Sequence, residues 1–546
     1  MRANHYLKLA IVVALLLSMQ AKAQVFKVDT LAYSGDPSNR INLVILGDGY
    51  AITDTTKFRS DALNTANYFL SVPPFNEYKN FFNFFAIEVI SNDSGNDHPG
   101  TGSDEPNPII QPITSVDNYL ESTFDYGVHR CVYSSNTGLV FSIANTNFPQ
   151  YDLLNVIVNT TYYGGCGGSV AFSTMNAASA EIFVHEFGHS FGGLQDEYEY
   201  GSMNCLPGSN QLINVTQETD SSILVWKKWL TTAQIPTPAD SSCNLIGLHE
   251  GAQYCFTNWY RPKCNCKMRQ LNQPLCEVCI EQFIYKINSL VDLNDDYSPQ
   301  NTAITICKSD SQLFTITPVR TIPNTVVTTW YLDNIPVLNN DTAYTFDASL
   351  FSAGAHQVKA VSYDSTVEAK KMLFPYQQVW NVSIVDPANG LAFTVTGDTL
   401  VSPYTQSQWY VVGNPVPVSS SDLTVCNQSG SYYVTGLDAN GCVATSDTIS
   451  VSCTTGLNEI HFASINILVK PNPFNDVVNI QGSGASASTY RITVQNVLGQ
   501  VLVNDEVAVR GNSFHTEITT ENLSKGIYFL VITSENYSYS QKMIKE

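Results

Sequence analysis

Residues 181–198 read Glu-Ile-Phe-Val-His-Glu-Phe-Gly-His-Ser-Phe-Gly-Gly-Leu-Gln-Asp-Glu-Tyr, and this stretch decides how the first half of the chain is interpreted. His185-Glu186-Phe187-Gly188-His189 within it is an HExxH motif. Residues four apart on a helix differ by only about 40° around its axis, so both imidazoles would face one point. Glu186 would reach a water beside a metal held there. The motif predicts zinc ligation by His185 and His189, with Glu186 as general base.

A catalytic zinc needs a third protein ligand, and the chain after the predicted helix offers two. The helix is predicted to begin near Asn176 and to end at Gly192-Gly193, since glycine is common just past a helix C-terminus. We expect Asp196 to be the third ligand, with Glu197 as the alternative. Tyr198 could hold an oxyanion or simply pack. The competing interpretation of the whole stretch is a helix with two structural histidines.

HEFGHSFGGLQDEY resembles the signature of the IgA-peptidase-like metallopeptidases, a metzincin-related family of mostly bacterial secreted enzymes. Metzincins share HExxHxxGxxH/D, and Gly192 falls in register with that pattern. Gln195 stands at the expected ligand position, however, and Asp196 comes one residue later. LGDGY at 46–50 extends the resemblance, which covers about residues 40–290.

The metzincin resemblance also implies a methionine turn beneath the metal. Cys266-Lys267-Met268-Arg269 is the better candidate for this turn, and Met203 is the weaker one. Met268 would then be a hydrophobic support and not a ligand. The alternative for Met268 is ordinary core packing.

The amino terminus predicts export. Arg2 and Lys8 give a positive segment before a short apolar run, Leu9 to Leu17, and Ala21-Lys22-Ala23 fits a signal peptidase site, so residues 1–23 are predicted to be a signal peptide. An uncleaved anchor is the alternative. We expect no transmembrane segment after cleavage. The net charge of −21 without a basic patch argues against nucleic acid as a partner.

Thirteen cysteines fit an oxidising compartment, and their odd number leaves one without a partner in the chain. Cys264-x-Cys266 and Cys276-x-x-Cys279 could form a second zinc site, but disulfides are the preferred interpretation for an exported chain. The loop from Asn92 to Asp104 has three aspartates that could hold Ca²⁺. A solvated loop is the preferred interpretation there.

The chain is predicted to be multidomain, with an α/β, metzincin-like catalytic domain followed by all-β sandwiches. Helical periodicity ends near residue 298, where Thr/Val/Tyr-rich runs begin to alternate with Asn, Asp, Gly and Ser turns. The predicted domains are a catalytic domain at 24–297, an Ig/PKD-like sandwich at 298–378, an Ig-like sandwich at 379–456 and a C-terminal module at 463–546.

The C-terminal module carries three ordered motifs. Pro471-Asn472-Pro473-Phe474 is followed by Gly499-Gln500-Val501 and then by Leu523-Ser524-Lys525-Gly526-Ile527-Tyr528. Their order resembles the C-terminal sorting domain of type IX secretion in Bacteroidetes. The resemblance implies a second export step across the outer membrane, with the type IX machinery as a partner and a secreted or cell-surface location.

These features together predict a secreted zinc-dependent endopeptidase acting on extracellular proteins or peptides. Two alternatives stay open: a surface adhesin whose zinc domain is not proteolytic, and a zinc amidohydrolase that cleaves a non-protein amide. The residues do not indicate which protein is the substrate.

Overall fold

The computed structural model describes residues 24–200, 203–453, 465–485, 488–534 and 537–546. The signal peptide predicted at 1–23 lies outside these residues. The chain divides after Asp386 into two compact units, which are described separately. Within the described residues, no helix is both long and apolar enough to span a bilayer.

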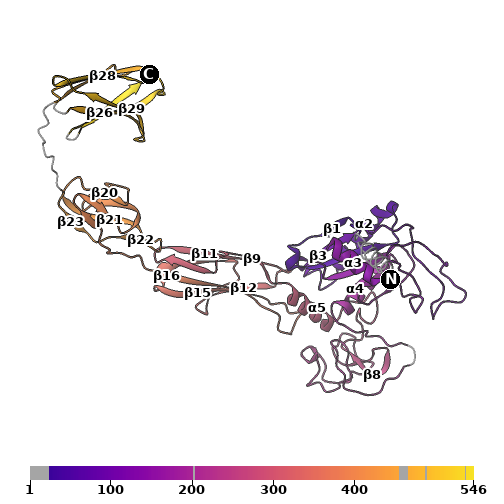
Figure 1. Ribbon diagram of the computed structural model, residues 1–546. Coiled ribbons are helices and arrows are strands. Elements are labelled where there is room, and N and C mark those ends of the chain that lie inside the picture. Colours follow the sequence, from indigo (N-terminus) through magenta and orange to yellow (C-terminus); the bar gives the residue numbers. More distant parts are fainter. Residues whose placement is uncertain (1–23, 201–202, 454–464, 486–487, 535–536) are drawn as a thin grey trace, which may run out of the picture. The chain divides into compact units, whose positions relative to one another are not determined.

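A six-stranded sheet forms the centre of the first unit (Figure 1), in the order β1-β3-β2-β4-β6-β5. The four inner strands are parallel, and the two edge strands β1 and β5 run antiparallel to their neighbours. The strands are β1 Val28–Ala32, β2 Ile41–Asp48, β3 Phe82–Ile87, β4 Leu153–Val158, β5 Gly165–Cys166 and β6 Ala171–Thr174. All eight residues of β2 are buried, as expected for a strand covered on both faces.

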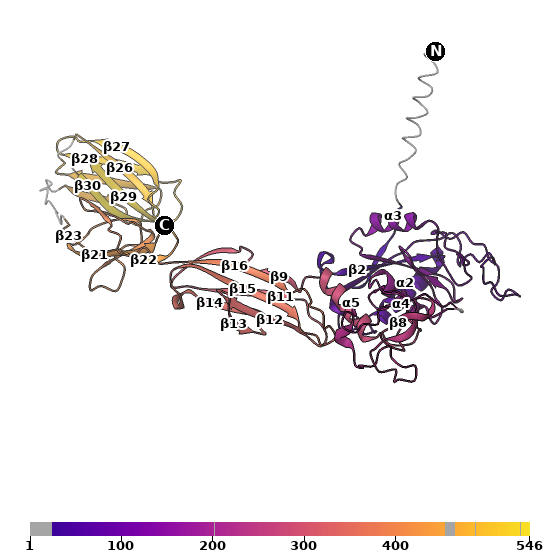
Figure 2. The same ribbon diagram turned by 90° about the horizontal axis from the view of Figure 1, so that it is seen from below.

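Alternate residues of β2 pack against helices on opposite faces of the sheet. Leu43 and Ile45 share a core with α2 (Thr55–Phe69) and α4 (Ser179–Ser190). Val44 and Leu46 share a second core with α3 (Thr137–Asn147). Figure 2 shows α3 on one side of β2 and the other two helices on the opposite side. This region is therefore a three-layer α/β domain with α4, the helix of the HExxH motif, packed on one face.

The helix α4 begins three residues after the predicted start near Asn176. The Asn176 side chain accepts a hydrogen bond from the amide of Ala178 (3.1 Å), and the Asn176 carbonyl accepts one from Ser179 (2.9 Å). Asparagine competes for the backbone in this way before a helix, so residues 176–178 form a turn.

The chain after α4 contains little regular structure before residue 249. A short helix, η4 (Lys227–Trp229), precedes the hairpin β7 (His249–Ala252) and β8 (Cys255–Arg261). Helix α5 (Glu277–Leu290) then packs Phe283, Ile284 and Ile287 into the same core as α4. The remaining short helices are η1 Pro37–Asn39, η2 Ile52–Asp54 and η3 Lys79–Phe81.

A β-sandwich completes the first unit. One sheet has the order β10-β16-β15-β12-β13 and the other β14-β11-β9. The strands are β9 Asn294–Ser298, β10 Ala303–Cys307, β11 Ser311–Pro318, β12 Val326–Leu332, β13 Ile335–Asn339, β14 Ala343–Asp347, β15 Gly354–Asp364 and β16 Tyr376–Val385, with η5 at Ala348–Leu350. Trp330 and Trp380 stack in its core with ring centroids 5.8 Å apart. The predicted boundary at 378/379 falls inside β16, which pairs with β15 and β10 of this sandwich.

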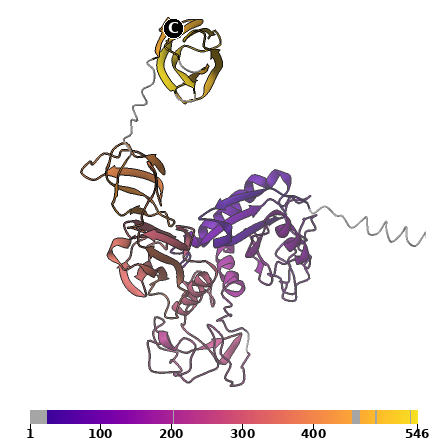
Figure 3. The same ribbon diagram turned by 60° about the vertical axis from the view of Figure 1, so that its left-hand side comes forward.

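The second unit holds two further β modules. The first comprises β17 Thr394–Thr396, β18 Thr399–Val401, β19 Thr405–Val411, β20 Leu423–Val425, β21 Gly430–Leu437, β22 Val443–Thr445 and β23 Ile449–Val451, around the buried Trp409. The C-terminal module has sheets β24-β25-β28 and β27-β26-β29-β30, whose buried side chains share one core; Figure 3 shows this module in yellow at the C-terminus. Its strands are β24 Asn466–Lys470, β25 Val477–Ser483, β26 Thr489–Asn496, β27 Val501–Ala508, β28 Ser513–Thr519, β29 Gly526–Ser534 and β30 Tyr537–Lys545.

Candidate metal centre

The helix α4 and the loop that follows it bring three side chains to one point. His185 Nε2 and His189 Nε2 lie 3.2 Å apart. Asp196 Oδ1 lies 3.2 Å from the first nitrogen and 3.3 Å from the second. Gly193, with φ +64°, adopts the left-handed conformation that lets the chain leave the helix and return toward it. The three residues therefore come together although Asp196 stands one position beyond the metzincin register.

The hydrogen bonds behind the two imidazoles direct lone pairs toward this point. His185 Nδ1 lies 3.0 Å from the Lys267 carbonyl, and His189 Nδ1 lies 2.8 Å from the Leu194 carbonyl. Because a carbonyl only accepts, each Nδ1 carries the hydrogen and each neutral ring presents an unprotonated Nε2. Among the described residues, Asp196 Oδ1 is buried without a hydrogen-bond donor. Three electron-pair donors facing one another form a group that could hold a metal ion.

The spacing of these three atoms fits a tetrahedral zinc site. With metal–ligand bonds of about 2.0–2.1 Å, neighbouring nitrogen and oxygen ligands lie roughly 3.3 Å apart. The measured separations of 3.2–3.3 Å match this value. Without a cation, burial lowers the pKa of His189 but Asp196 outweighs it and raises that pKa to about 9, so a proton would compete with the metal.

Glu197, the alternative ligand, points away from the histidines. Its side chain is fully buried and accepts a hydrogen bond from Asn214 Nδ2 at 2.9 Å. Its Oε1 also lies 3.4 Å from Cys279 Sγ. Of the two neighbouring carboxylates, Asp196 is thus the one that faces the histidines.

Tyr254, which sequence reasoning missed, contacts the second oxygen of the Asp196 carboxylate. Its hydroxyl donates to Asp196 Oδ2, and burial together with that carboxylate raises the pKa of Tyr254 to about 12. Tyr254 lies in the tight turn between β7 and β8, with φ +64°, and its ring lies 5.3 Å from that of Tyr198. No local pattern distinguishes this tyrosine, because it reaches the site only through the hairpin.

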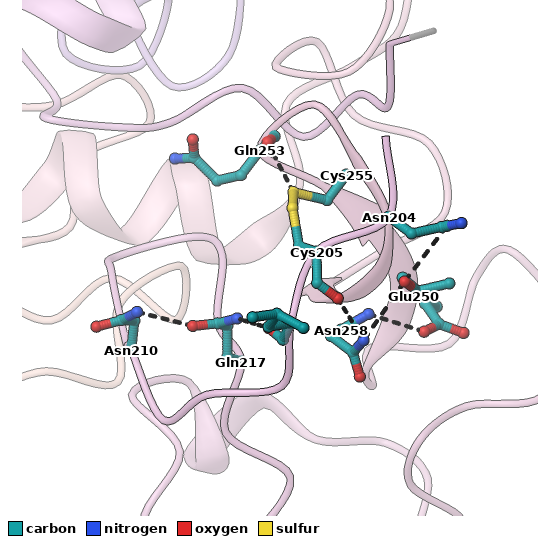
Figure 4. Close-up of a disulfide and its surroundings, with 10 residues drawn as sticks. Asn204, Cys205, Asn210, Gln217, Glu250, Gln253, Cys255 and Asn258 are labelled. Carbon is teal, nitrogen blue, oxygen red and sulfur yellow. Dashed lines mark hydrogen bonds between the residues drawn. A yellow bond between two sulfur atoms is a disulfide. The ribbon is translucent and has the colours of Figure 1, made fainter. Parts of the chain in front are cut away.

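A disulfide holds the Tyr254 turn against the segment after Tyr198. Figure 4 shows Cys205 bonded to Cys255, the residue after Tyr254. Asn258 Nδ2 donates to the Cys205 carbonyl at 2.7 Å, which adds a second connection between the same two segments. The chain beyond Asp196 is thereby fixed to the hairpin that supplies its hydrogen-bond donor.

Glu186 opens into a cavity of about 360 Å³ beside the three converging side chains. The cavity is also lined by Gly165, Cys166, Tyr198, Lys267 and Arg269. A Cβ on Gly167 would lie 2.1 Å from Glu186 Oε2, so any larger residue there would have to displace the carboxylate. Burial raises the pKa of Glu186, although His185 and His189 partly oppose the shift.

Met268 lies directly beneath the HExxH helix. It is fully buried, whereas Met203, the weaker candidate, is 56% exposed. The Met268 sulfur would lie 2.5 Å from a Cβ placed on Gly188, the residue before His189. Lys267, its neighbour, supplies the carbonyl that orients His185.

The disulfides predicted for Cys266, Cys276 and Cys279 are absent from the described structure. Cys264 pairs with Cys243, while the other three cysteines are free and buried beside Glu197. The oxidising compartment does produce disulfides elsewhere, at Cys131–Cys166, Cys205–Cys255 and Cys426–Cys453. The prediction was wrong for these three residues because the fold gathers them around a carboxylate.

The aspartates of the loop from Asn92 to Asp104 do not converge on a calcium site. Asp93 Oδ2, Asp97 Oδ1 and Asp104 Oδ1 each accept a backbone hydrogen bond, from residues 117, 116 and 129 respectively. They do not form a metal-ligand group in the part of the chain that the structure describes.

Family models match two segments of the chain and confirm both resemblances. Residues 30–244 match the model described as IgA Peptidase M64, and residues 469–546 match the secretion system C-terminal sorting domain. The first match indicates a peptidase of metallopeptidase type. The second indicates export to the cell surface or the medium. No curated protein matched the chain.

The solved structures that match share little sequence with this chain. The five immunoglobulin domains of Sidekick-1 are 14% identical with a TM-score of 0.16, over 46% of this chain and 59% of that one. The chain thus spans less than two thirds of that structure. The Bacteroides ovatus mixed-linkage glucan utilization protein SGBP-B is 14% identical with a TM-score of 0.13, over 46% of this chain and 71% of that one. Latent PorU from Porphyromonas gingivalis is 10% identical with a TM-score of 0.13, over 47% and 34%.

Proposed function

We propose, from the match of residues 30–244 to the IgA peptidase M64 family model, that this chain is a secreted zinc-dependent endopeptidase. One observation carries the proposal: two imidazole nitrogens and a buried carboxylate oxygen converge at 3.2–3.3 Å beside a cavity that contains Glu186. His185, His189 and Asp196 would hold the metal. A bound zinc would polarise the scissile carbonyl and increase the acidity of a water.

Glu186 is the general base of the proposed reaction. Its carboxylate takes a proton from the attacking water and delivers it to the leaving amine. The carboxylate must be ionised to accept that proton. Hydrolysis is therefore expected to increase as the pH rises through the pKa of Glu186 in the metal-bound enzyme.

The edge of the sheet suggests how a peptide would bind. β5 is the last strand of the six-stranded sheet, and both of its residues line the cavity with Glu186. An extended peptide can add to such an edge through backbone hydrogen bonds. The Cys131–Cys166 disulfide anchors this strand. This position would bring a peptide bond of the substrate alongside Glu186, and Tyr198 on the cavity wall is placed to contact its carbonyl oxygen.

The two alternatives make different predictions about products. An adhesin would retain metal and cleave nothing, and an amidohydrolase would cleave a non-protein amide while leaving peptides intact. The intact HExxH glutamate beside the cavity favours hydrolysis over adhesion.

Cleavage-site profiling of the mature chain tests the proposal. A peptide library and denatured extracellular proteins would be incubated with the enzyme, with the enzyme and a chelator, and with chelated enzyme to which Zn²⁺ is restored. We expect internal cleavages that the chelator abolishes and Zn²⁺ restores. An absence of peptide cleavage in all three samples, with zinc bound, would contradict the proposal.

A further inference from the structure

Three cysteines and a glutamate converge in the core next to the candidate metal centre. Cys266, Cys276, Cys279 and Glu197 are buried, with side-chain ligand atoms all within 4.8 Å of one another. Cys279 Sγ lies 3.8 Å from Cys266 Sγ and 3.5 Å from Cys276 Sγ. It lies 3.4 Å from Glu197 Oε1. One sulfur is therefore in contact with each of the other three groups.

These separations correspond to a tetrahedral metal site. Zn–S bonds of about 2.3 Å place two sulfur ligands roughly 3.8 Å apart, and a sulfur and an oxygen ligand roughly 3.5 Å apart. A disulfide would need sulfurs about 2.05 Å apart, and three cysteines cannot all be paired among themselves. If two of the three cysteines formed a disulfide instead, the third would remain as a buried thiol beside a buried carboxylate.

A backbone donor is directed at one of the three sulfurs. Cys276 is the N-cap of α5, and its amide lies 3.3 Å from Cys266 Sγ, toward which it donates. Glu197 Oε2 is buried without a hydrogen-bond donor among the described residues. A bound cation would satisfy this oxygen and balance the charge of thiolate ligands beside it.

We propose that Cys266, Cys276, Cys279 and Glu197 bind a second Zn²⁺, at a closed structural site. Three thiolates select a soft or borderline ion such as zinc over calcium or magnesium. Four protein ligands leave no open position for water, which distinguishes this site from the candidate catalytic centre.

The proposed site joins the parts that shape the candidate catalytic centre. Glu197 follows Asp196 in the chain, and its amide donates to the Met268 carbonyl at 2.9 Å. Cys266 precedes Lys267, whose carbonyl orients His185. One ion would therefore fix the positions of Asp196, Met268 and the Lys267 carbonyl relative to α5.

The unmodified mature chain provides the first test. The ten other cysteines are disulfide-bonded, so denaturation with chelator and without reductant should release three reactive thiols. The native protein should protect them. Replacement of zinc by Co²⁺ should produce a sulfur-to-cobalt charge-transfer band. A single reactive thiol after denaturation, or three thiols without that band, would overturn the proposal.

Variants separate this site from the catalytic one. Cys279→Ser should lower the zinc content by one ion per chain and remove the charge-transfer band. His185→Ala with His189→Ala should also lower it by one ion but leave the band intact. An unmodified chain that shows the band but cleaves no peptide would refute the proposed function alone. An unchanged zinc content in soluble Cys279→Ser would refute the structural site alone.

A different observation supports a third zinc site, in the segment between β3 and α3. His98, Glu105, Asp125 and His129 also form a potential ligand group, and the His98 and Asp125 side chains are fully buried. His98 Nε2 lies 3.5 Å from Glu105 Oε2 and 3.5 Å from Asp125 Oδ2. His129 Nδ1 lies 2.6 Å and 3.2 Å from oxygens of the same two carboxylates.

The hydrogen bonds of this group again direct a lone pair inward. His98 Nδ1 lies 2.9 Å from the Pro112 carbonyl, so it carries the hydrogen and leaves Nε2 facing two carboxylates. Among the described residues, Glu105 Oε1 is buried without a donor. We infer that these two imidazoles and two carboxylates bind Zn²⁺, since two nitrogen ligands favour zinc over calcium.

Metal analysis of the full chain tests this second inference. His98→Asn should lower the zinc content by one ion per chain while the cobalt–thiolate band stays. His356→Asn is a matched control, because that histidine pairs with Asp333 in the first sandwich, and it should change nothing. Equal zinc contents in the His98→Asn variant and the unmodified chain would overturn the inference. The four side chains would then be a cluster of ion pairs between imidazolium and carboxylate groups, without a metal.

Discussion

The sulfur of Met268 lies so close to Gly188 that a Cβ added there would meet it at 2.5 Å. Gly188 immediately precedes His189 on α4, and Met268 is fully buried beneath that turn of the helix. Met268 thus packs closely against the HExxH helix, next to Lys267, whose carbonyl orients His185. This contact is a structural reason for glycine at position 188, the fourth residue of the HExxH motif.

Gly188→Ala should therefore destabilise the α/β domain by about 1–3 kcal/mol, because a methyl group cannot enter this packed contact without displacing Met268. The measurement is the free energy of unfolding in denaturant, taken from the transition in which zinc is released. Gly138→Ala on α3 is the control, since a Cβ there meets nothing within 4 Å. Adding Met268→Ala to Gly188→Ala should cost less than the sum of the two changes. Strict additivity would mean that the contact does not constrain the helix.

Asp196→Asn and Glu197→Gln should each impair a different one of the two proposed zinc sites. Asn at 196 keeps the shape but removes the charge that faces both histidines, so the catalytic zinc should be lost. Gln at 197 should leave that ion in place and weaken the thiolate site. The test is zinc titration of each chain, with activity measured in parallel. Retention of the catalytic ion by Asp196→Asn, with its loss from Glu197→Gln, would make Glu197 the third ligand.

Tyr254→Phe should weaken catalytic zinc binding by about 10–100-fold, the usual cost of removing a hydrogen bond to a metal ligand. The variant loses only the hydroxyl that donates to Asp196 Oδ2. Activity should recover when zinc is added in excess, because the ligands remain. Tyr200→Phe is the control, since that side chain is 70% exposed. Equal zinc affinities in the two variants would show that the contact has no role in metal binding.

The HExxH chemistry and its neighbourhood could be predicted because they are local. Four-residue helical spacing places His185 and His189 together. A glycine turn shortly before Asp196 predicts that the chain turns back toward the helix and supplies a third ligand. The choice between Asp196 and Glu197 could not be made from spacing alone. It depends on Asn214 and Cys279, which draw Glu197 to the other side of the chain.

The remaining site residues depend on contacts between distant segments. Tyr254 reaches Asp196 across 58 positions through a hairpin that carries no sequence signal. Cys266 and Cys279 meet Glu197 only when α5 packs beneath α4. The first sandwich also extends beyond its predicted end, because β16 pairs with β15 after a long connection that resembles a linker.

Lys267→Met should destabilise the chain by about 3–5 kcal/mol, because it leaves Glu181 buried without its cation. The Lys267 side chain is 3% exposed and pairs with Glu181, which is 11% exposed. Lys263→Met breaks a more exposed pair with Glu277 and should cost only about 0–1 kcal/mol. Chemical unfolding of both variants checks the difference. Adding Glu181→Gln to Lys267→Met should recover part of the loss, and equal effects of the two lysine variants would contradict the account.

In the proposed mechanism, Glu186 performs proton transfer at a metal held by His185, His189 and Asp196. The most direct measurement is kcat/KM of Glu186→Gln on a peptide identified by the profiling, with zinc content determined on the same sample. Glu368→Gln, on the exposed surface of the first sandwich, is the matched control. We predict a loss of at least about 10²–10⁴-fold, the usual contribution of a general base, with zinc content unchanged. Near-normal cleavage by Glu186→Gln with full zinc would contradict the account.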